Sequence, residues 1–321
     1  MKRRHLIVAP LALLAAPALA QRSYPERPVR ILIPFAPGGG VDVVGRMMAA
    51  ALQAKLGQPF VVENRPGGGG LLAMRAVAAA APDGHVLGIG SPGPLTIAPT
   101  LIPNANFDVL EMLDPVQIFA TTPGILIGRN GLPARNLAEL IAHSRASANP
   151  LNMASAGTGS VLHLIGEHLQ ERLGVKWTHV PYRGSGPAFA DLIAGNVDLM
   201  VDVVPTSAPL VLGGQARAFV VTMPARASQL PDVPTLAEAG HGAADMGSWM
   251  ALMAPRGTPP AVIAALNAAL GETLADTAFR ERLAASGAVP VGGSAAEVAS
   301  RIRDETRLWA GIIRTANVRA E

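Results

Sequence analysis

The sequence predicts an α/β protein with two lobes, in which mostly parallel sheets are flanked by helices and a ligand cleft lies between the lobes. Short apolar runs alternate with segments of helical period, and glycine or proline marks most junctions. This alternation is typical of βαβ units. Two glycine-rich turns, far apart in the chain, each open their own strand–helix series. Because ligands bind at the carboxyl ends of such strands, both turns are expected beside one cleft.

Each expected element follows from such a run or period. The apolar runs predict strands at 29–35, 60–62, 86–89, 116–119, 125–127, 151–153, 176–180, 197–200 and 217–221. The helical period predicts helices at 43–56, 71–80, 137–146, 162–173 and 188–194. Helix signals dominate the C-terminal part, where Pro259-Pro260 opens one helix and Ser294, three residues before Glu297, opens another. The segment 248–254 and these helices are expected to return to the first lobe.

The first residues have the pattern of a secretory signal peptide, which we place at 1–20. A basic start is followed by an apolar stretch to Leu14 and by Ala18-Leu19-Ala20. The apolar stretch is too short for a membrane span. The remaining chain can bury two cores, and we expect a first lobe of 21–121 with 223–321 and a second lobe of 122–222.

Composition excludes several classes of protein. Residues 1–20 hold 3 of the 26 basic residues and none of the 23 acidic ones, so the rest of the chain carries 23 of each. With 4% aromatic residues and no basic cluster, no nucleic-acid partner is expected. The absence of cysteine excludes disulfides, thiolate metal sites and a thiol nucleophile. We expect neither a cofactor nor a metal.

The first glycine-rich turn runs from Phe35 through Gly38, Gly39 and Gly40 to Val41 and Asp42. Glycine lets backbone approach a ligand, and the first amides of the following helix point at whatever fills the turn. The turn is therefore a candidate anion site. Its spacing fits neither a Rossmann fingerprint nor a Walker loop, which would require Lys after the last glycine. Asp42 either caps or braces the turn, or contacts the ligand directly.

The second turn, 155–160, has a similar design and contains Ser155, Gly157, Thr158, Gly159 and Ser160. His163 follows early in the next helix and either braces the loop or contacts the ligand. Tyr182 and Arg183 end another strand, and Arg183 is the nearby cation that could hold a carboxylate through two hydrogen bonds. A solvent-exposed Arg183 is the alternative.

The sequence offers little catalytic chemistry. It contains no G-x-S-x-G or H-E-x-x-H motif, and His163 and His168 are five residues apart, so they do not share a helix face. Asp198 and Asp202 lie on a strand-like pattern. Either they form an acid–base pair, or one ends a strand at the rim of the cleft and the other braces a loop. A hydrolase or nucleotide-dependent enzyme on the same architecture remains an alternative, as does a sensory protein that contacts a histidine kinase.

Seven motifs, spread over essentially the whole mature chain, occur in the order seen in the Bug family, which the chain resembles. They are Tyr24-Pro-Glu-Arg-Pro28, Ile33-Pro-Phe-Ala-Pro-Gly-Gly-Gly-Val-Asp42, Val62-Glu-Asn-Arg-Pro-Gly67, Ala81-Pro-Asp-Gly84, Val180-Pro-Tyr-Arg-Gly184, Val197-Asp-Leu-Met200 and Leu230-Pro-Asp-Val-Pro-Thr235. Bug proteins are periplasmic solute receptors of tripartite tricarboxylate transporters. The resemblance implies a two-lobed periplasmic-binding-protein (Venus flytrap) fold that closes on a small carboxylate and delivers it to a membrane permease. It also implies a periplasmic location, no enzymatic activity and, we expect, a monomer.

In that family the two turns hold a carboxylate from opposite lobes, partly through ordered water. The candidate ligand-binding residues are therefore Phe35, Gly38, Gly39, Gly40, Val41, Asp42, Ser91, Ser155, Ala156, Gly157, Thr158, Gly159, Ser160, His163, Tyr182, Arg183 and Asp202. This chain departs from the family pattern by placing Val41, Ala156 and Val161-Leu162 where hydroxyl groups are common. Each lost hydroxyl removes a possible hydrogen bond to a charged group, worth about 1.5–3 kcal/mol. The hypothesis is a ligand with fewer polar groups than citrate, such as a monocarboxylate, an aromatic acid or a simple diacid.

Overall fold

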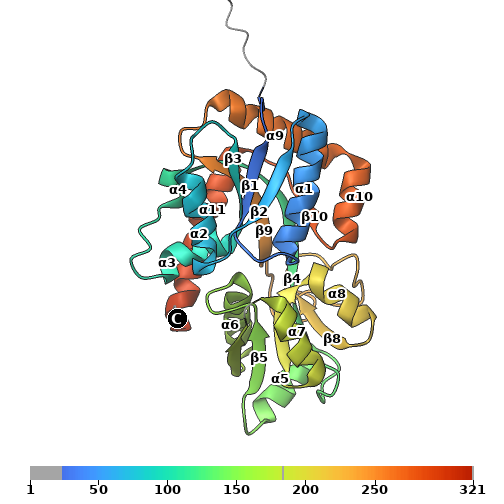
Figure 1. Cartoon of the computed structure of the whole chain (residues 1–321). Helices are drawn as coiled ribbons and strands as arrows, with labels where there is room; N and C mark the ends of the chain where they lie inside the picture. Colours follow the sequence, from blue (N-terminus) through green and yellow to red (C-terminus); the bar gives the residue numbers. More distant parts are fainter. Residues whose placement is uncertain (1–23, 183, 320–321) are drawn as a thin grey trace, which may run out of the picture.

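The computed structural model describes residues 24–182 and 184–319. The expected signal peptide at 1–20 and the candidate Arg183 lie outside these residues. Figure 1 shows two groups of strands and helices joined along a long central strand, β4 (Leu113–Arg129). The strands form one continuous path in the order β2-β1-β3-β9-β4-β7-β5-β6, with β8 and β10 also pairing with β4.

The first sheet combines the start of β4 with five other strands. They are β1 (Val29–Ile33), β2 (Phe60–Asn64), β3 (Val86–Gly90), β9 (Gly247–Pro255) and β10 (Val289–Pro290). β1 pairs in parallel with β2 and β3, whereas β9 is antiparallel to both β3 and β4. The outer strands therefore have the expected parallel pairing, and the middle of the molecule is antiparallel.

The second sheet combines the end of β4 with four other strands. They are β5 (Leu151–Ser155), β6 (Trp177–Pro181), β7 (Leu199–Val203) and β8 (Ala216–Val221). β5 is parallel to β6 and β7, while β7 and β8 are antiparallel to β4. The expectation of mostly parallel pairing is thus too simple, because β4 and β9 pair only antiparallel within the described residues.

The prediction of separate strands at 116–119 and 125–127 is wrong, because β4 continues through the Thr-Pro-Gly sequence between them. Thr122 donates its hydroxyl to the Ser248 carbonyl at 3.0 Å, and Pro123 lies opposite Gly247 of β9. Proline normally breaks a central strand because it lacks an N–H donor. Here Pro123 lies at the point where the partner of β4 changes from β9 to β7 and β8.

Helices cover both faces of the two sheets. Two hydrophobic clusters join helices to the first sheet. One contains residues of α1 (Gly40–Leu56), α9 (Pro260–Ala275) and α10 (Thr277–Ala285). The other contains residues of α2 (Leu71–Ala78), α4 (Val109–Met112) and the start of α11 (Ala295–Thr315). Two further clusters join helices to the second sheet. One contains residues of α5 (Leu137–Ala146) and α6 (Val161–Leu173), and the other contains residues of α7 (Ser185–Ala194) and α8 (Val204–Leu212). Short helical turns occur at η1 (Gly68–Gly70), η2 (Gly93–Ile97) and α3 (Ala98–Leu101).

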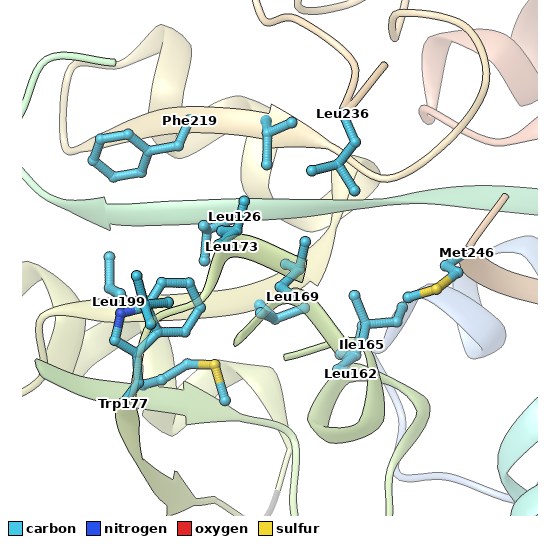
Figure 2. Close-up of a cluster of buried hydrophobic side chains, with 14 of the residues drawn as sticks. Leu126, Leu162, Ile165, Leu169, Leu173, Trp177, Leu199, Phe219, Leu236 and Met246 are labelled. Atoms are coloured by element: carbon cyan, nitrogen blue, oxygen red, sulfur yellow. The ribbon is translucent and has the colours of Figure 1, made fainter. Parts of the chain in front are cut away.

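Helix α6, which follows the second glycine turn, is anchored by a stripe of leucine and isoleucine side chains. Leu162, Ile165, Leu169 and Leu173 recur at helical spacing and are buried with Trp177 and other residues of the second sheet. Figure 2 shows these side chains in one cluster that also contains Leu126 and Leu199 of the sheet and, near Ile165, Met246. Burying an aliphatic side chain of this size contributes about 1.5–3 kcal/mol, so the start of α6 is firmly placed.

The C-terminal helix α11 packs against both core regions. Val298 and Ile302 belong to a cluster of the first sheet, while Trp309 and Ile312 belong to a cluster of the second. The Ser294–Glu297 capping box predicted from the sequence opens this helix. Among the described residues, no helix has both the length and the apolar character needed to cross a membrane.

Candidate functional site

The first glycine turn connects the carboxyl end of β1 to the start of α1. Gly38 has φ +85°, in the left-handed region, while Gly39 is extended and caps α1 without a side chain. Within the described ranges, the backbone N–H groups of Gly39, Gly40 and Val41 have no hydrogen-bond acceptor. Gly38 and Gly39 are exposed. The turn therefore presents free amides at the positive end of a 17-residue helix, which is the arrangement that binds anions.

Asp42 braces this turn. Its buried carboxylate accepts the N–H of Gly38 at 3.0 Å, the Nε of Arg46 at 3.1 Å and the Nδ2 of Asn64 at 2.8 Å. Burial acts to raise the pKa of Asp42, but the hydrogen bonds from Arg46, Gly38 and Asn64 outweigh burial and hold that pKa below its usual value. Of the two functions considered for Asp42, the structure therefore shows bracing.

Asn64, at the end of β2, completes the brace. Its Nδ2 also donates to the carbonyl of Phe35 at 2.9 Å, and its Oδ1 accepts from Arg46 at 2.8 Å. The Phe35 ring faces Gly93, since a Cβ placed on Gly93 would lie 3.6 Å from the end of that ring. Ser91, which follows β3, is buried and its carbonyl accepts the N–H of Leu95 at 3.1 Å.

The second turn connects β5 to α6 and is held by hydrogen bonds within the loop. Gly157 and Gly159 have φ values of +131° and +73°, which favour glycine. The Ser160 side chain caps α6 by accepting the N–H of His163 at 3.2 Å. The Ser155 hydroxyl, fully buried, accepts the N–H of Gly157 at 3.2 Å. Residues 156–160 are half-buried, so the turn retains an accessible face.

Two stacked histidine rings lie beneath the second turn. The rings of His163 and His179 are parallel to within 8°, with centroids 3.6 Å apart. His163 Nδ1 accepts the N–H of Gly159 at 3.1 Å, and His179 Nε2 lies 2.7 Å from the Ser155 hydroxyl. Burial and the neighbouring His163 lower the pKa of His179 to about 4, so His179 is neutral near pH 7. His163 therefore contacts the loop through Gly159, as expected of a residue that braces it.

Tyr182 contacts the second turn through its backbone. Its N–H donates to the Ser155 carbonyl at 3.1 Å, while its phenol donates to Asp191 at 2.6 Å. Burial and Asp191 raise the pKa of Tyr182 to about 12. The Tyr182 hydroxyl is thus engaged with Asp191 and away from the loop.

Asp202 and Asp198 do not form an acid–base pair. Asp202, at 1% exposure, accepts hydroxyl hydrogen bonds from Ser185 at 3.1 Å and Thr206 at 2.8 Å. Asp198 instead binds Arg129 Nε at 2.9 Å and the N–H of Asn152 at 3.0 Å. Burial raises the pKa of Asp202 to about 6, although its hydrogen bonds act in the opposite direction. The two carboxylates have separate structural partners.

Both turns lie where the first-sheet and second-sheet halves meet. A Cβ on Gly40 would lie 3.7 Å from Val203 Cγ2 at the end of β7, next to Asp202. A Cβ on Gly159 would overlap Leu101 of α3, which follows β3 and Ser91. Each turn thus contacts an element of the other half, and the candidate residues follow the boundary between the halves.

Sequence reasoning missed several residues of this arrangement. Asn64 lies in the strand–glycine–helix motif at 63–70, so its position beside a turn could have been noticed. His179 looks like an ordinary strand residue, and the contacts of Val203 and Leu101 depend on how the halves pack. No sequence signal identifies these three.

Two hollows on the described surface lie away from these turns. One is lined by α11, including Ser300, Glu305 and Trp309, and the other lies between α9 and the segment around Asp114. Within the described residues, no group of three or more His, Cys, Asp or Glu side chains is placed to hold a metal ion.

Comparison with known proteins gives consistent matches over the whole fold. Residues 44–318 match the family model described as "Tripartite tricarboxylate transporter family receptor". The chain is 38% identical over 302 residues to protein BugT of Bordetella pertussis, covering 94% of this chain and 92% of that protein.

Two solved structures from Rhodopseudomonas palustris are also similar. Rpa4515 with adipate has a TM-score of 0.87 at 34% identity, covering 92% of this chain and 99% of that one. MatC (Rpa3494) with bound malate has a TM-score of 0.82 at 36% identity, covering 90% of this chain and all of that one. The similar structures include periplasmic binding proteins, which identifies the two-lobed fold.

Proposed function

The chain belongs to the tripartite tricarboxylate transporter receptor family, and we propose that it captures a small organic carboxylate between two lobes in the periplasm and delivers it to the membrane permease of such a transporter. Members of this family are periplasmic solute-binding receptors, and the similar structures are solute-binding proteins and not enzymes. The hydrolase and nucleotide-dependent alternatives are therefore set aside.

One observation carries the proposal: two glycine turns, each at the N-terminus of a long helix, lie at the boundary between the halves. The first offers free N–H groups at Gly39, Gly40 and Val41. A helix N-terminus stabilises an anion by roughly 0.3–1 kcal/mol, or about 2 when partly buried. Association costs at least about 4 kcal/mol, so one turn is too weak alone. Two turns that close together on one carboxylate can supply the difference.

The proposed lobes follow the strand groups. Lobe 1 comprises 21–121 with 223–321, and lobe 2 comprises 122–222, so that the chain crosses between them within β4 and again before β9. The ligand-binding residues proposed from the sequence remain the two turns with their flanking residues. Asp42, His163 and Tyr182 act mainly by holding these turns, because their polar atoms already have protein partners. We propose that the receptor is monomeric.

The ligand is proposed to be a monocarboxylate, an aromatic acid or a simple diacid. Val41 is half-buried in the first turn of α1, and Ala156 is half-buried in the second glycine turn. Neither side chain can hydrogen-bond to additional polar groups of a ligand. Arg46, the cation beside the first turn, is engaged by Asp42 and Asn64. Adipate and malate, bound by the two related proteins, are suitable first probes.

A thermal-shift screen over organic acids tests this function. At a concentration 100 times its Kd, a bound acid adds about 2.7 kcal/mol to the free energy of unfolding. We expect adipate, malate or another simple acid to raise the melting temperature, and citrate to do so least. Tight binding of citrate with no response to simpler acids contradicts the ligand class. X-ray scattering then tests closure: the radius of gyration is expected to fall at saturating ligand, and an unchanged radius contradicts a closing clamp.

A further inference from the structure

The stacked histidines beneath the second turn have a role beyond packing. We propose that His163 and His179 are positioning residues, whose neutral rings hold the second turn in its binding conformation and make carboxylate affinity sensitive to acid. This inference rests on the proposed function for its effect on affinity, but its structural part concerns the turn alone.

The first step is the tautomer of His163. Because Gly159 donates its N–H to Nδ1 of His163 at 3.1 Å, that nitrogen must keep its lone pair. The ring proton is therefore on Nε2, which faces Glu167 Oε1 at 3.4 Å. The Glu167 carboxylate favours this tautomer, because it can accept the proton on Nε2. The hydrogen bond at Gly159 thus depends on a neutral His163.

The second step is the link from His179 to the other end of the turn. His179 Nε2 lies 2.7 Å from the Ser155 hydroxyl, and Ser155 accepts the N–H of Gly157 at 3.2 Å. The two rings, 3.6 Å apart, therefore connect both glycines of positive φ to one rigid stack. The stack lies between β6 and α6, and both elements are anchored in the core that contains Trp177 and Leu164.

Protonation of the stacked histidine rings would break the contact with Gly159. Among the described residues, the titratable groups that contact one another at this stack are His163 and Glu167 on α6 and His179 on β6. A proton on His163 Nδ1 would place one N–H donor against the Gly159 N–H and remove the acceptor. A second proton on the stack would place two cations 3.6 Å apart. Protonation of His163 Nδ1 is therefore expected to release Gly159 and lower carboxylate affinity.

The test combines NMR of the ligand-free protein with binding of adipate and malate. Long-range 1H–15N spectra report the His163 tautomer, and the Gly159 amide resonance reports the hydrogen bond. We expect the Nε2–H tautomer and a Gly159 amide shift that changes together with the His163 titration. An Nδ1–H tautomer at neutral pH, or a Gly159 amide that ignores the titration, overturns the inference even if adipate and malate both bind.

Two variants separate positioning from stability. His163→Phe keeps a ring in the stack but removes the acceptor, whereas in His163→Asn the Oδ1 atom replaces Nδ1 as the acceptor. We expect His163→Phe to weaken binding by about tenfold, the loss of one hydrogen bond. His163→Asn should restore most of that affinity, because an amide oxygen can accept the Gly159 N–H and does not take up a proton.

The comparison holds even if both variants lose stability, because the variant that keeps a ring, His163→Phe, is expected to bind more weakly than the variant that keeps only the acceptor, His163→Asn. Equal affinities for His163→Phe and wild type contradict the inference. If the protein binds neither adipate nor malate, the proposed function fails for those acids, and the NMR measurement still decides whether the histidines hold the turn.

Discussion

The carboxylate of Asp42 accepts the backbone N–H of Gly38 at 3.0 Å, so the helix that presents the free amides also fixes the loop in front of them. The Asp42 carboxylate would repel an anionic ligand, and the hydrogen bond from Gly38 partly offsets its negative charge. The negative charge is further balanced by Arg46 at 3.0 Å. The first turn is thus rigid and close to neutral, while its amides remain free.

Removing this brace is expected to lower stability. Asp42→Ala removes the acceptor of the Gly38 N–H and one of the two acceptors of Asn64 Nδ2, which costs about 1–3 kcal/mol in the free energy of unfolding. Asp42→Asn keeps an oxygen that can face Gly38 and should lose less. Urea unfolding followed by circular dichroism measures both. Equal stability of Asp42→Ala and wild type would show that the brace is unimportant.

The same contact has a defined pH dependence. Because the pKa of Asp42 is lowered in the folded protein, its contribution is fully present above the pKa of the unfolded chain, about 3.9, and is lost as pH falls through the folded value. The stability difference between wild type and Asp42→Ala is therefore expected to be constant from pH 8 to pH 5 and to shrink below pH 4. A difference that persists unchanged in acid contradicts this assignment.

Asp202 is expected to have the opposite dependence. Its pKa of about 6 lies above the unfolded value, so between pH 4 and pH 6 the folded state binds more protons than the unfolded state. Its contribution to stability is present in acid and is lost as pH rises through about 6. Asp202→Asn removes this dependence. As pH rises from 4 to 7, the free energy of unfolding of the variant should therefore increase relative to that of wild type by on the order of 2–3 kcal/mol.

The quantity to measure is the difference in the free energy of unfolding between wild type and Asp202→Asn at each pH. Other groups also change the stability of both proteins between pH 4 and pH 7. His179, with a pKa lowered to about 4, destabilises the folded state as pH falls from 6.5 towards 4, opposing Asp202. Subtracting the Asp202→Asn curve from the wild-type curve removes this shared effect. If the difference in the free energy of unfolding does not change with pH, the pKa of Asp202 is the same in the folded and unfolded states.

Glu305 is expected to stabilise the helix that packs on both core regions. Its carboxylate accepts the indole N–H of Trp249 at 2.7 Å and that of Trp309 at 3.3 Å, and it pairs with Arg301 Nε at 2.8 Å. Both indoles are nearly inaccessible to solvent. Glu305→Ala leaves two buried donors unsatisfied, which should cost about 2–4 kcal/mol.

Glu305→Gln is the matched control, because it retains one acceptor oxygen and is expected to lose about half as much. Guanidinium unfolding followed by far-ultraviolet circular dichroism measures these losses without relying on the two tryptophans. A loss below about 0.5 kcal/mol in Glu305→Ala would show that the indoles find other partners.

Local patterns predicted most elements and both turns. The strand starting at Val29 and the helix ending at Leu173 follow from apolar runs, helical period and glycine, which act over a few residues. The continuous β4 was not predicted, because Pro123 and Gly124 look like a turn until their partners are known. Gly124 is required there by close packing: a Cβ would overlap Thr222.

The site was predicted less completely than the fold. Glycine spacing and the family resemblance located the turns, but which groups hold them depends on neighbours distant in the chain. His179 reaches Ser155 from the adjacent strand, and Asn64 reaches Asp42 from another strand end. Such contacts arise from strand order, which single-sequence patterns do not specify.

If the free backbone amides of the first turn bind the carboxylate, Gly39→Asp should weaken binding. Gly39 is an exposed, extended N-cap whose added Cβ would meet only the Ala36 carbonyl at 3.8 Å. Aspartate is a favoured N-cap, so stability should be kept or raised, while its carboxylate occupies the amides and repels the ligand. Gly271→Asp is the control, because a Cβ added to Gly271 of α9 would meet no atom within 4 Å and this residue lies outside both turns; it should keep the affinity of wild type.

Isothermal titration calorimetry with the best-binding acid of the screen gives the decisive comparison. We expect at least about a tenfold loss of affinity in Gly39→Asp, equivalent to about 1.4 kcal/mol, with no loss in Gly271→Asp. If Gly39→Asp binds the acid as tightly as wild type, the free amides of the first turn are not the carboxylate site.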